Sequence, residues 1–262
     1  MSHFPRDLVH AVGFLSRLPL PPRWFGRHFE GHDGRLSRAV RAFPLAGLVI
    51  ALLPALVVLA LASLSADALV SAVLVVALQI ALTGALHEDG LADTADGIGA
   101  RRGREHALEI MEDSTTGAYG VLALALSVLL RVAATAALIV ALPGLAVALV
   151  LIAAAMLSRA AMVLHWHLLP SAKTDGLAVS VGTPRPSSVT VSTVSALVVG
   201  LPATLLAVGP VAALLGLLSL GLASALFSRR IRARLGGFTG DTIGATQQIA
   251  EIAFLAALAI AL

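Results

Sequence analysis

Residues 43–63 read FPLAGLVIALLPALVVLALAS, a run without a single charged side chain. As a helix, this run is long enough to cross the roughly 30 Å hydrocarbon layer of a membrane. The whole chain shares this character, because 58% of its 262 residues are hydrophobic, only 13% are charged, and the mean hydropathy is +0.93. A soluble domain carries about 25% charged residues. The composition therefore predicts an all-α, polytopic integral membrane protein.

Seven apolar runs are long enough to span a bilayer, near 43–63, 67–87, 117–142, 143–168, 189–208, 209–227 and 242–262. Of the 18 Lys and Arg residues, 16 lie before the first run or after the second, fourth and sixth runs. The other three connections carry none. By the positive-inside rule, the basic segments and the N-terminus are cytoplasmic, and the C-terminus is outside. Because topology explains the excess of basic charge, we do not expect a nucleic-acid partner.

The chain is expected to form one membrane domain, 1–262. Its first 42 residues form an interfacial segment, in which 7–18 have the pattern of a short amphipathic helix, and 43–262 form the transmembrane bundle. The absence of cysteine excludes disulfides and thiolate chemistry. Whether the protein forms oligomers is left open.

Two arginines, Arg131 and Arg159, fall inside predicted spans, and Glu251 is the acid deep in the last one. A charged side chain within the bilayer is costly and usually faces a partner or a polar interior. A structural ion pair of one arginine with Glu251 and a role in substrate binding are about equally supported.

The chemistry is concentrated where the second span meets the cytoplasm, in the stretch HEDGLADTADG at 87–97. On a helix, Asp89, Asp93 and Asp96 share one face, where like charges repel one another. A divalent cation would compensate that repulsion. The small residues between these aspartates would let a ligand or another helix approach closely.

A second acidic helix is predicted over 104–113, with Glu109 and Asp113 on one face. Glycines between the two helices would allow Asp113 to face the first trio. Carboxylate oxygens favour Mg²⁺, or Mn²⁺ as a substitute, over Zn²⁺. Two such ions held by shared aspartates are a recurring device for phosphoryl displacement. Glu105 and Glu112 are better explained as partners of nearby arginines, and His87 as a structural histidine.

The glycine-rich segment 235–245 is a second candidate site. Gly237, Gly240 and Asp241 would offer backbone N–H groups and a side chain to a phosphate at the start of the last helix. Alternatively, Asp241 is only the N-cap of that helix.

Two resemblances follow from these motifs. Asp93, Asp96, Gly97, Ala100 and Arg101 reproduce the first half of the CDP-alcohol phosphotransferase signature, whose second half is not matched. The longer strings HEDGLADTADG at 87–97, IMEDSTTGAYG at 110–120 and LGGFTGDTIGA at 235–245 resemble the cobalamin synthase family, the adenosylcobinamide-GDP ribazoletransferases. That family is expected to carry an aliphatic residue where this chain has Glu88, so Glu88 is not predicted as a ligand.

The cobalamin synthase resemblance implies a Mg²⁺-dependent enzyme of the bacterial cytoplasmic membrane, with its active site on the cytoplasmic side. Its substrates would be adenosylcobinamide-GDP and α-ribazole or α-ribazole 5′-phosphate, and it would release GMP while forming adenosylcobalamin or its phosphate. The predicted metal ligands are Asp89, Asp93, Asp96 and Asp113, and either Asp113 or Asp89 would act as general base. Arg101 and Arg102 are the nearest candidates to bind the departing phosphate.

Two alternatives remain at this stage. A CDP-alcohol-type phosphotransferase of phospholipid synthesis would release CMP instead of GMP. A transporter would use Arg131, Arg159 and Glu251 along a path, but its substrate site would be expected near the membrane midplane, whereas the acids here cluster in one connection.

Overall fold

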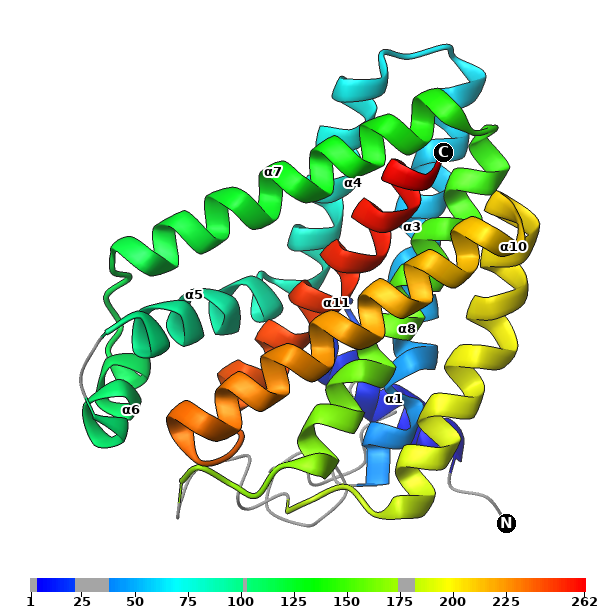
Figure 1. Cartoon of the computed structure of the whole chain (residues 1–262). Coiled ribbons are helices and arrows are strands. Elements are labelled where there is room, and N and C mark those ends of the chain that lie inside the picture. The colour runs from blue at the N-terminus through cyan, green and yellow to red at the C-terminus, as the bar shows by residue number, and fades with distance from the viewer. Residues whose placement is uncertain (1–3, 22–37, 101–102, 174–181) are drawn as a thin grey trace.

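The computed structural model describes residues 4–21, 38–100, 103–173 and 182–262. The described chain folds into helices with no named strand, which confirms the all-α prediction (Figure 1). The helices are α1 (Phe4–Leu15), the short 3₁₀ helix η2 (Val40–Ala42), α3 (Phe43–Ser63), α4 (Ala68–Thr83), α5 (Leu86–Gly99), α6 (Arg104–Glu112), α7 (Ala118–Ala141), α8 (Gly144–Leu168), α10 (Pro186–Leu235) and α11 (Gly240–Ala261).

Within the described residues, five helices are long and apolar enough to cross a membrane, and a sixth crossing is formed if α4 and α5 count as one bent span. The axis turns by 88° between those two helices. We therefore assign the crossing to α4 and place α5 outside it. The predicted second run, 67–87, thus ends four residues early, at Thr83.

The predicted fifth and sixth runs both lie in α10, which breaks at Gly209. This glycine has φ 77°, a left-handed conformation that residues with a side chain rarely adopt. Figure 1 shows the two arms of α10 leaving this break in different directions. With α10 counted as two arms, the helices match the seven predicted runs. The inside–outside orientation of the termini stays a prediction from the charge pattern.

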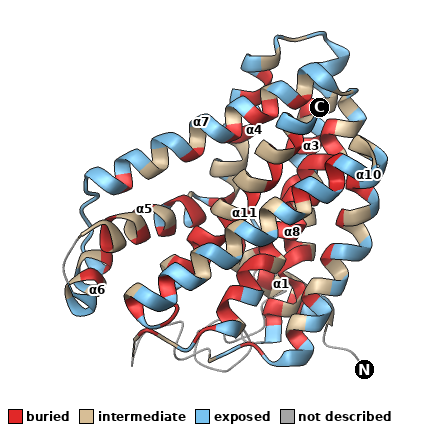
Figure 2. Ribbon diagram, in the orientation of Figure 1, coloured by how far each residue is buried: buried red, intermediate tan, exposed pale blue. Residues whose placement is uncertain are grey.

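Helix α8 lies at the centre of the bundle and packs against α3, α10 and α11. Of the 18-residue apolar stretch of α8, 78% is buried inside the protein, compared with 28% of the corresponding stretch of α7. The outer face of α7 exposes a row of leucines, among them Leu122, Leu126 and Leu129 (Figure 2). Such a face is what a helix in contact with lipid requires. Helix α1, at the position of the predicted amphipathic helix, packs on α3 and η2.

Candidate functional site

A sharp turn after α4 separates the acidic stretch from the membrane span. Gly84 and Ala85 have φ values of 62° and 58°, so two consecutive residues are left-handed. The backbone N–H of Arg17 donates to the carbonyl of Leu82 over 2.7 Å, and a Cβ on Gly84 would lie 2.5 Å from Nε of Arg17. The segment that follows α1 therefore covers this turn and fixes the direction in which α5 leaves.

Helix α5 then packs backbone to backbone against the start of α11. A Cβ on Gly90 would lie 2.7 Å from the carbonyl oxygen of Asp241, and one on Gly244 would lie 3.5 Å from Cα of His87. The close approach that the small residues predict is confirmed, with α11 as the partner helix. It brings Asp241, more than 140 positions away in the sequence, to the face of α5 that carries the aspartates.

Four carboxylates consequently form one electrostatic group, which we call the acidic cluster: Asp89, Asp93, Asp96 and Asp241. The pKa of Asp93 is raised to about 6, first by its partial burial and then by the charges of Asp89, Asp241 and Asp96. Asp89 is exposed, Asp93 and Asp241 are half-buried, and Asp96 is buried. No ion pair to these four side chains is formed within the described residues, so their repulsion is not compensated there.

Asp96 also connects α5 to the start of α7. Its two carboxylate oxygens accept hydrogen bonds from the backbone N–H groups of Gly117 (2.7 Å) and Gly120 (2.9 Å). A Cβ on either glycine would collide with this carboxylate, which explains why both positions carry glycine. Asp96 therefore has a structural role whatever else it binds.

Asp113 lies apart from the acidic cluster. Helix α6 ends at Glu112, one residue before the predicted end, and Asp113 is its C-cap, where the chain becomes extended. Its Oδ1 accepts a hydrogen bond from the backbone N–H of Thr115 over 2.9 Å, and this bond lowers the pKa of the carboxyl. Asp113 and Asp96 nevertheless line one pocket of about 300 Å³, together with Ala100, Ile110, Thr115, Gly117 and Tyr119.

The glycine-rich segment 235–245 forms the entry to α11. Gly236 has φ 76°, and a Cβ on Gly237 would overlap the carbonyl of Pro170. Thr239, rather than Asp241, is the N-cap: it forms a capping box with Thr242, and its hydroxyl donates to Asp241 over 3.3 Å. The N-cap alternative for Asp241 is therefore wrong. Gly240 is exposed, and binding of a phosphate here by Gly237, Gly240 and Asp241 stays a prediction.

Two described basic side chains, Arg234 of α10 and Lys173 of the segment after α8, make contacts at the ends of α5 and α6. Arg101 and Arg102 lie outside the described residues, so their predicted contact with a phosphate is not described. Arg234 donates to the carbonyl of Ala100 over 2.8 Å, and Lys173 pairs with Glu112 over 2.7 Å. Glu112 is therefore in an ion pair, as predicted, although its partner is a lysine from the segment after α8. The distance in sequence between these partners explains why no local pattern indicated them.

The donors of the acidic cluster are suited to a divalent cation. They are carboxylate oxygens, the ligands that Mg²⁺ and Mn²⁺ prefer. A cation would also relieve the repulsion that raises the pKa of Asp93. In the described part of the chain, no three carboxylates or imidazoles converge closely enough to surround one ion. The fit therefore rests on donor chemistry and on uncompensated charge.

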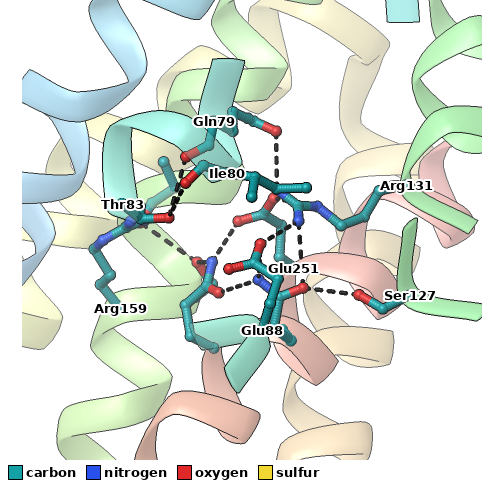
Figure 3. A network of polar contacts seen from close by, with 12 residues as sticks. Gln79, Ile80, Thr83, Glu88, Ser127, Arg131, Arg159 and Glu251 are labelled. Atoms are coloured by element: carbon teal, nitrogen blue, oxygen red, sulfur yellow. Dashed lines mark hydrogen bonds and ion pairs between the residues drawn. The ribbon is translucent and has the colours of Figure 1, made fainter. Parts of the chain in front are cut away.

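A second charged group lies inside the bundle and includes Glu88 from the start of α5 (Figure 3). Nη1 of Arg131 donates to Glu88 over 2.7 Å, its Nη2 donates to Gln79 over 3.0 Å, and its Nε lies 3.3 Å from Glu251. We call these residues, with Gln247, Gln248 and Arg159, the buried network. The predicted pair of Arg131 with Glu251 is confirmed, and Glu88 is a second partner that the sequence did not indicate.

Arg159 lies at the same buried centre but is held differently. It donates to the carbonyl of Ala155 on its own helix over 3.0 Å. Among the described residues, no carboxylate lies within ion-pair distance of it. Arg159 and Arg131 both line a cavity of about 20 Å³, enough for a water molecule.

Comparison with known proteins gives a consistent result over the whole chain. The family model described as Cobalamin-5-phosphate synthase matches residues 7–259. A protein of Sinorhizobium sp named adenosylcobinamide-GDP ribazoletransferase is 50% identical over 99% of this chain and 98% of its own length. Proteins of the same name are 52% identical in Rhizobium etli and 41% identical in Brucella anthropi, each over 98% of this chain and 97% of their own length. No solved structure matches.

Proposed function

Because this chain belongs to the cobalamin-5-phosphate synthase family, we propose that it joins adenosylcobinamide-GDP to α-ribazole or α-ribazole 5′-phosphate and releases GMP. The relatives are named for this transfer and match over nearly their full length, which supports the same activity here. Their name also favours GMP over CMP as the leaving group, and so disfavours the CDP-alcohol alternative. We place the reaction in the bacterial cytoplasmic membrane, on the cytoplasmic side, in agreement with the basic segments around α5 and α6.

The observation that carries the proposal is the acidic cluster. Four aspartates from α5 and α11 lie together without an ion pair among the described residues, and the pKa of Asp93 is raised to about 6, first by its burial and then by the charges of the other three. An enzyme that displaces one phosphate of a diphosphate must stabilise the negative charge of the reacting and departing phosphates, which needs positive charge at the site. We therefore propose that carboxylates of this cluster, Asp89, Asp93, Asp96 and Asp241, bind Mg²⁺ as one or two ions, with Mn²⁺ as a substitute. When bound, Mg²⁺ would neutralise charge on the two phosphates of the nucleotide.

The remaining steps fall to side chains of the chain itself. A hydroxyl of α-ribazole attacks the phosphorus next to cobinamide, a new O–P bond forms, the bond between the two phosphates breaks, and GMP leaves with the bridging oxygen. The proton of the hydroxyl goes to Asp113 or Asp89. The pocket between Asp96 and Asp113 favours Asp113, because the pocket is wide enough to bring a ribose hydroxyl between these carboxylates.

The phosphate of the departing GMP needs donors nearby. Arg101 and Arg102 connect α5 to α6 and stay the first candidates, with the backbone N–H groups at the start of α11 as a second. Among the described basic residues, Lys173 is the one whose charge reaches Asp241. We propose that it supports binding of the same phosphate.

The direct test is a product assay on purified protein in lipid nanodiscs. We expect GMP release from adenosylcobinamide-GDP only when α-ribazole and Mg²⁺ are both present, and loss of release when the metal is chelated. A parallel reaction with a CDP-alcohol donor should yield no CMP. CMP without GMP would overturn the proposal in favour of a phospholipid-type transferase, and neither product would overturn the enzymatic assignment.

A further inference from the structure

Glu88 and Asp89 are consecutive residues, so their side chains leave α5 in directions about 100° apart. Glu88 is 5% exposed and lies in the buried network, whereas Asp89 is exposed and lies in the acidic cluster. Oε1 of Glu88 accepts hydrogen bonds from Arg131 on α7 (2.7 Å) and from Gln248 on α11 (3.1 Å). Any rotation or shift of α5 that displaces Asp89 must also displace Glu88 from these partners.

The first turn of α5 is not stabilised by a capping side chain. Its N-cap is Ala85, which is left-handed and offers no side chain to the first turn. The far end is fixed by Asp96, through Gly117 and Gly120, and by Arg234, which donates to the carbonyl of Ala100. At the near end, α5 packs closely on α11 at Gly90, and Glu88 supplies the hydrogen-bonded side chain.

Arg131 is the residue that connects the near end to the rest of the bundle. It contacts Gln79 on α4, Glu88 on α5 and Glu251 on α11, and is itself on α7. The four helices around the start of α5 therefore meet at one guanidinium group, whose planar array of donors suits several acceptors at once. Figure 3 shows Arg131 among these acceptors.

We propose that Arg131 is a positioning residue: through its ion pair with Glu88, it fixes the orientation of α5 and so the placement of Asp89 and Asp93 against Asp241. The effect of Arg131 on metal binding and GMP release rests on the proposed function, whereas its effect on the orientation of α5 does not. Arg131 does not face the acidic cluster and acts on it only through α5.

A buried ion pair gives this proposal a distinctive signature. Removing one partner leaves the other charge buried without compensation, whereas replacing both by neutral groups of similar size is far less harmful. Arg131→Gln should therefore release α5, and adding Glu88→Gln should restore it, because the buried network then keeps one arginine and one glutamate, Arg159 and Glu251, whose formal charges cancel. Arg159→Gln is the matched control, since Arg159 is equally buried in the same cavity but bonds to its own helix.

The structural test is hydrogen–deuterium exchange on metal-free protein in nanodiscs, read by mass spectrometry. In Arg131→Gln, we expect peptides covering 86–99 to exchange at least about tenfold faster, with peptides from α8 unchanged. The double variant Glu88→Gln with Arg131→Gln should return α5 to within about threefold of the original rate. Unchanged exchange of α5 in folded Arg131→Gln, or equal loosening of α5 in Arg159→Gln, would overturn the proposal.

The functional test uses Mn²⁺ binding, followed by electron paramagnetic resonance, beside GMP release. We expect Arg131→Gln to weaken Mn²⁺ binding at least about tenfold and to raise the metal concentration needed for half-maximal release, with recovery of both in the double variant. If the unaltered protein neither binds Mn²⁺ nor releases GMP, the proposed function fails, while exchange still decides whether Arg131 holds α5. If α5 exchanges faster in Arg131→Gln but Mn²⁺ binds as in the unaltered protein, the claim that Arg131 positions the acidic cluster is wrong.

Discussion

The buried network and the acidic cluster both include residues of α5, yet they balance charge in opposite ways. The network contains two arginines and two glutamates, so its formal charges cancel, and Arg131 contacts both glutamates. The cluster contains four aspartates and, within the described residues, no ion-paired cation. A group whose charges cancel among its own residues can stabilise the fold without a ligand, whereas one with excess charge is suited to a ligand of the opposite charge.

The largest expected effect breaks the cluster. Asp93→Asn should lower GMP release at least about 100-fold, because the proposed Mg²⁺, which would neutralise charge on the phosphates, loses one of its ligands. The protein should still insert and purify normally. Asp96→Asn should do the same, although it also disturbs the N–H groups of Gly117 and Gly120. The measurement is the initial rate of GMP release at saturating Mg²⁺.

Asp67→Asn is the control for this substitution. Asp67 is the N-cap of α4, at the end of that helix far from α5, and accepts a hydrogen bond from the N–H of Val70. It should keep nearly full activity. If Asp93→Asn and Asp96→Asn both retain more than a few per cent of the rate, the metal assignment fails.

The next effect breaks the buried network instead. Arg131→Met should lower the free energy of unfolding by about 3–5 kcal/mol, because Glu88 and Glu251 are left buried without their partner. Thermal unfolding in nanodiscs measures it, beside the unaltered protein at the same pH. A change of less than about 1 kcal/mol would mean that the glutamates take up protons and that the pair contributes little.

The contrast between these regions also explains what the sequence could predict. Apolar runs predicted the helices, since burial in lipid acts on each run by itself. The periodicity of Asp89, Asp93 and Asp96 predicted one acidic face for the same reason: it is a property of a single helix. Neither signal carries information about which distant segment packs against it.

Partners from distant segments were accordingly missed. Asp241 reaches the cluster because Gly90 and Gly244 let α5 and α11 approach, and the small residues were the only sequence signal of it. Asp113 was expected on a helix, but α6 ends one residue earlier and the chain extends there. Glu88 was not predicted as a ligand, but its partners on α7 and α11, which place it in the bundle interior, were not indicated by the sequence.

A smaller effect tests the contact that brings the cluster together. A methyl group on Gly90 would lie 2.7 Å from a backbone oxygen of α11, so Gly90→Ala must push the helices apart at a cost of about 1–3 kcal/mol. GMP release should fall with it, since Asp241 moves away from Asp93. Gly221→Ala, where the added methyl group would meet nothing within 4 Å, should leave both stability and rate unchanged. Equal behaviour of the two variants would show that close packing of α5 on α11 is not required.

The smallest expected effect is a pH dependence of stability that arises from Asp93 in the acidic cluster. The pKa of Asp93 is raised to about 6, so its ionised form is disfavoured in the folded protein relative to the unfolded chain. The resulting destabilisation is absent below the ordinary pKa of 3.8, grows as the pH rises through that interval, and is complete above pH 6. In metal-free protein, Asp93→Asn should therefore raise the free energy of unfolding at pH 8 by on the order of 1 kcal/mol, allowing for solvent screening of a half-exposed group. At pH 4, the substitution should change the free energy of unfolding little.

Added Mg²⁺ should reverse the order of stability at pH 8, because the unaltered protein binds the ion and is stabilised by it, whereas the variant lacks one of the ligands. Thermal unfolding of both proteins at pH 4 and pH 8, with and without Mg²⁺, measures this reversal of their relative stability. A stabilised variant that keeps its advantage in Mg²⁺ would show that the repulsion at Asp93 has a purpose other than binding a cation.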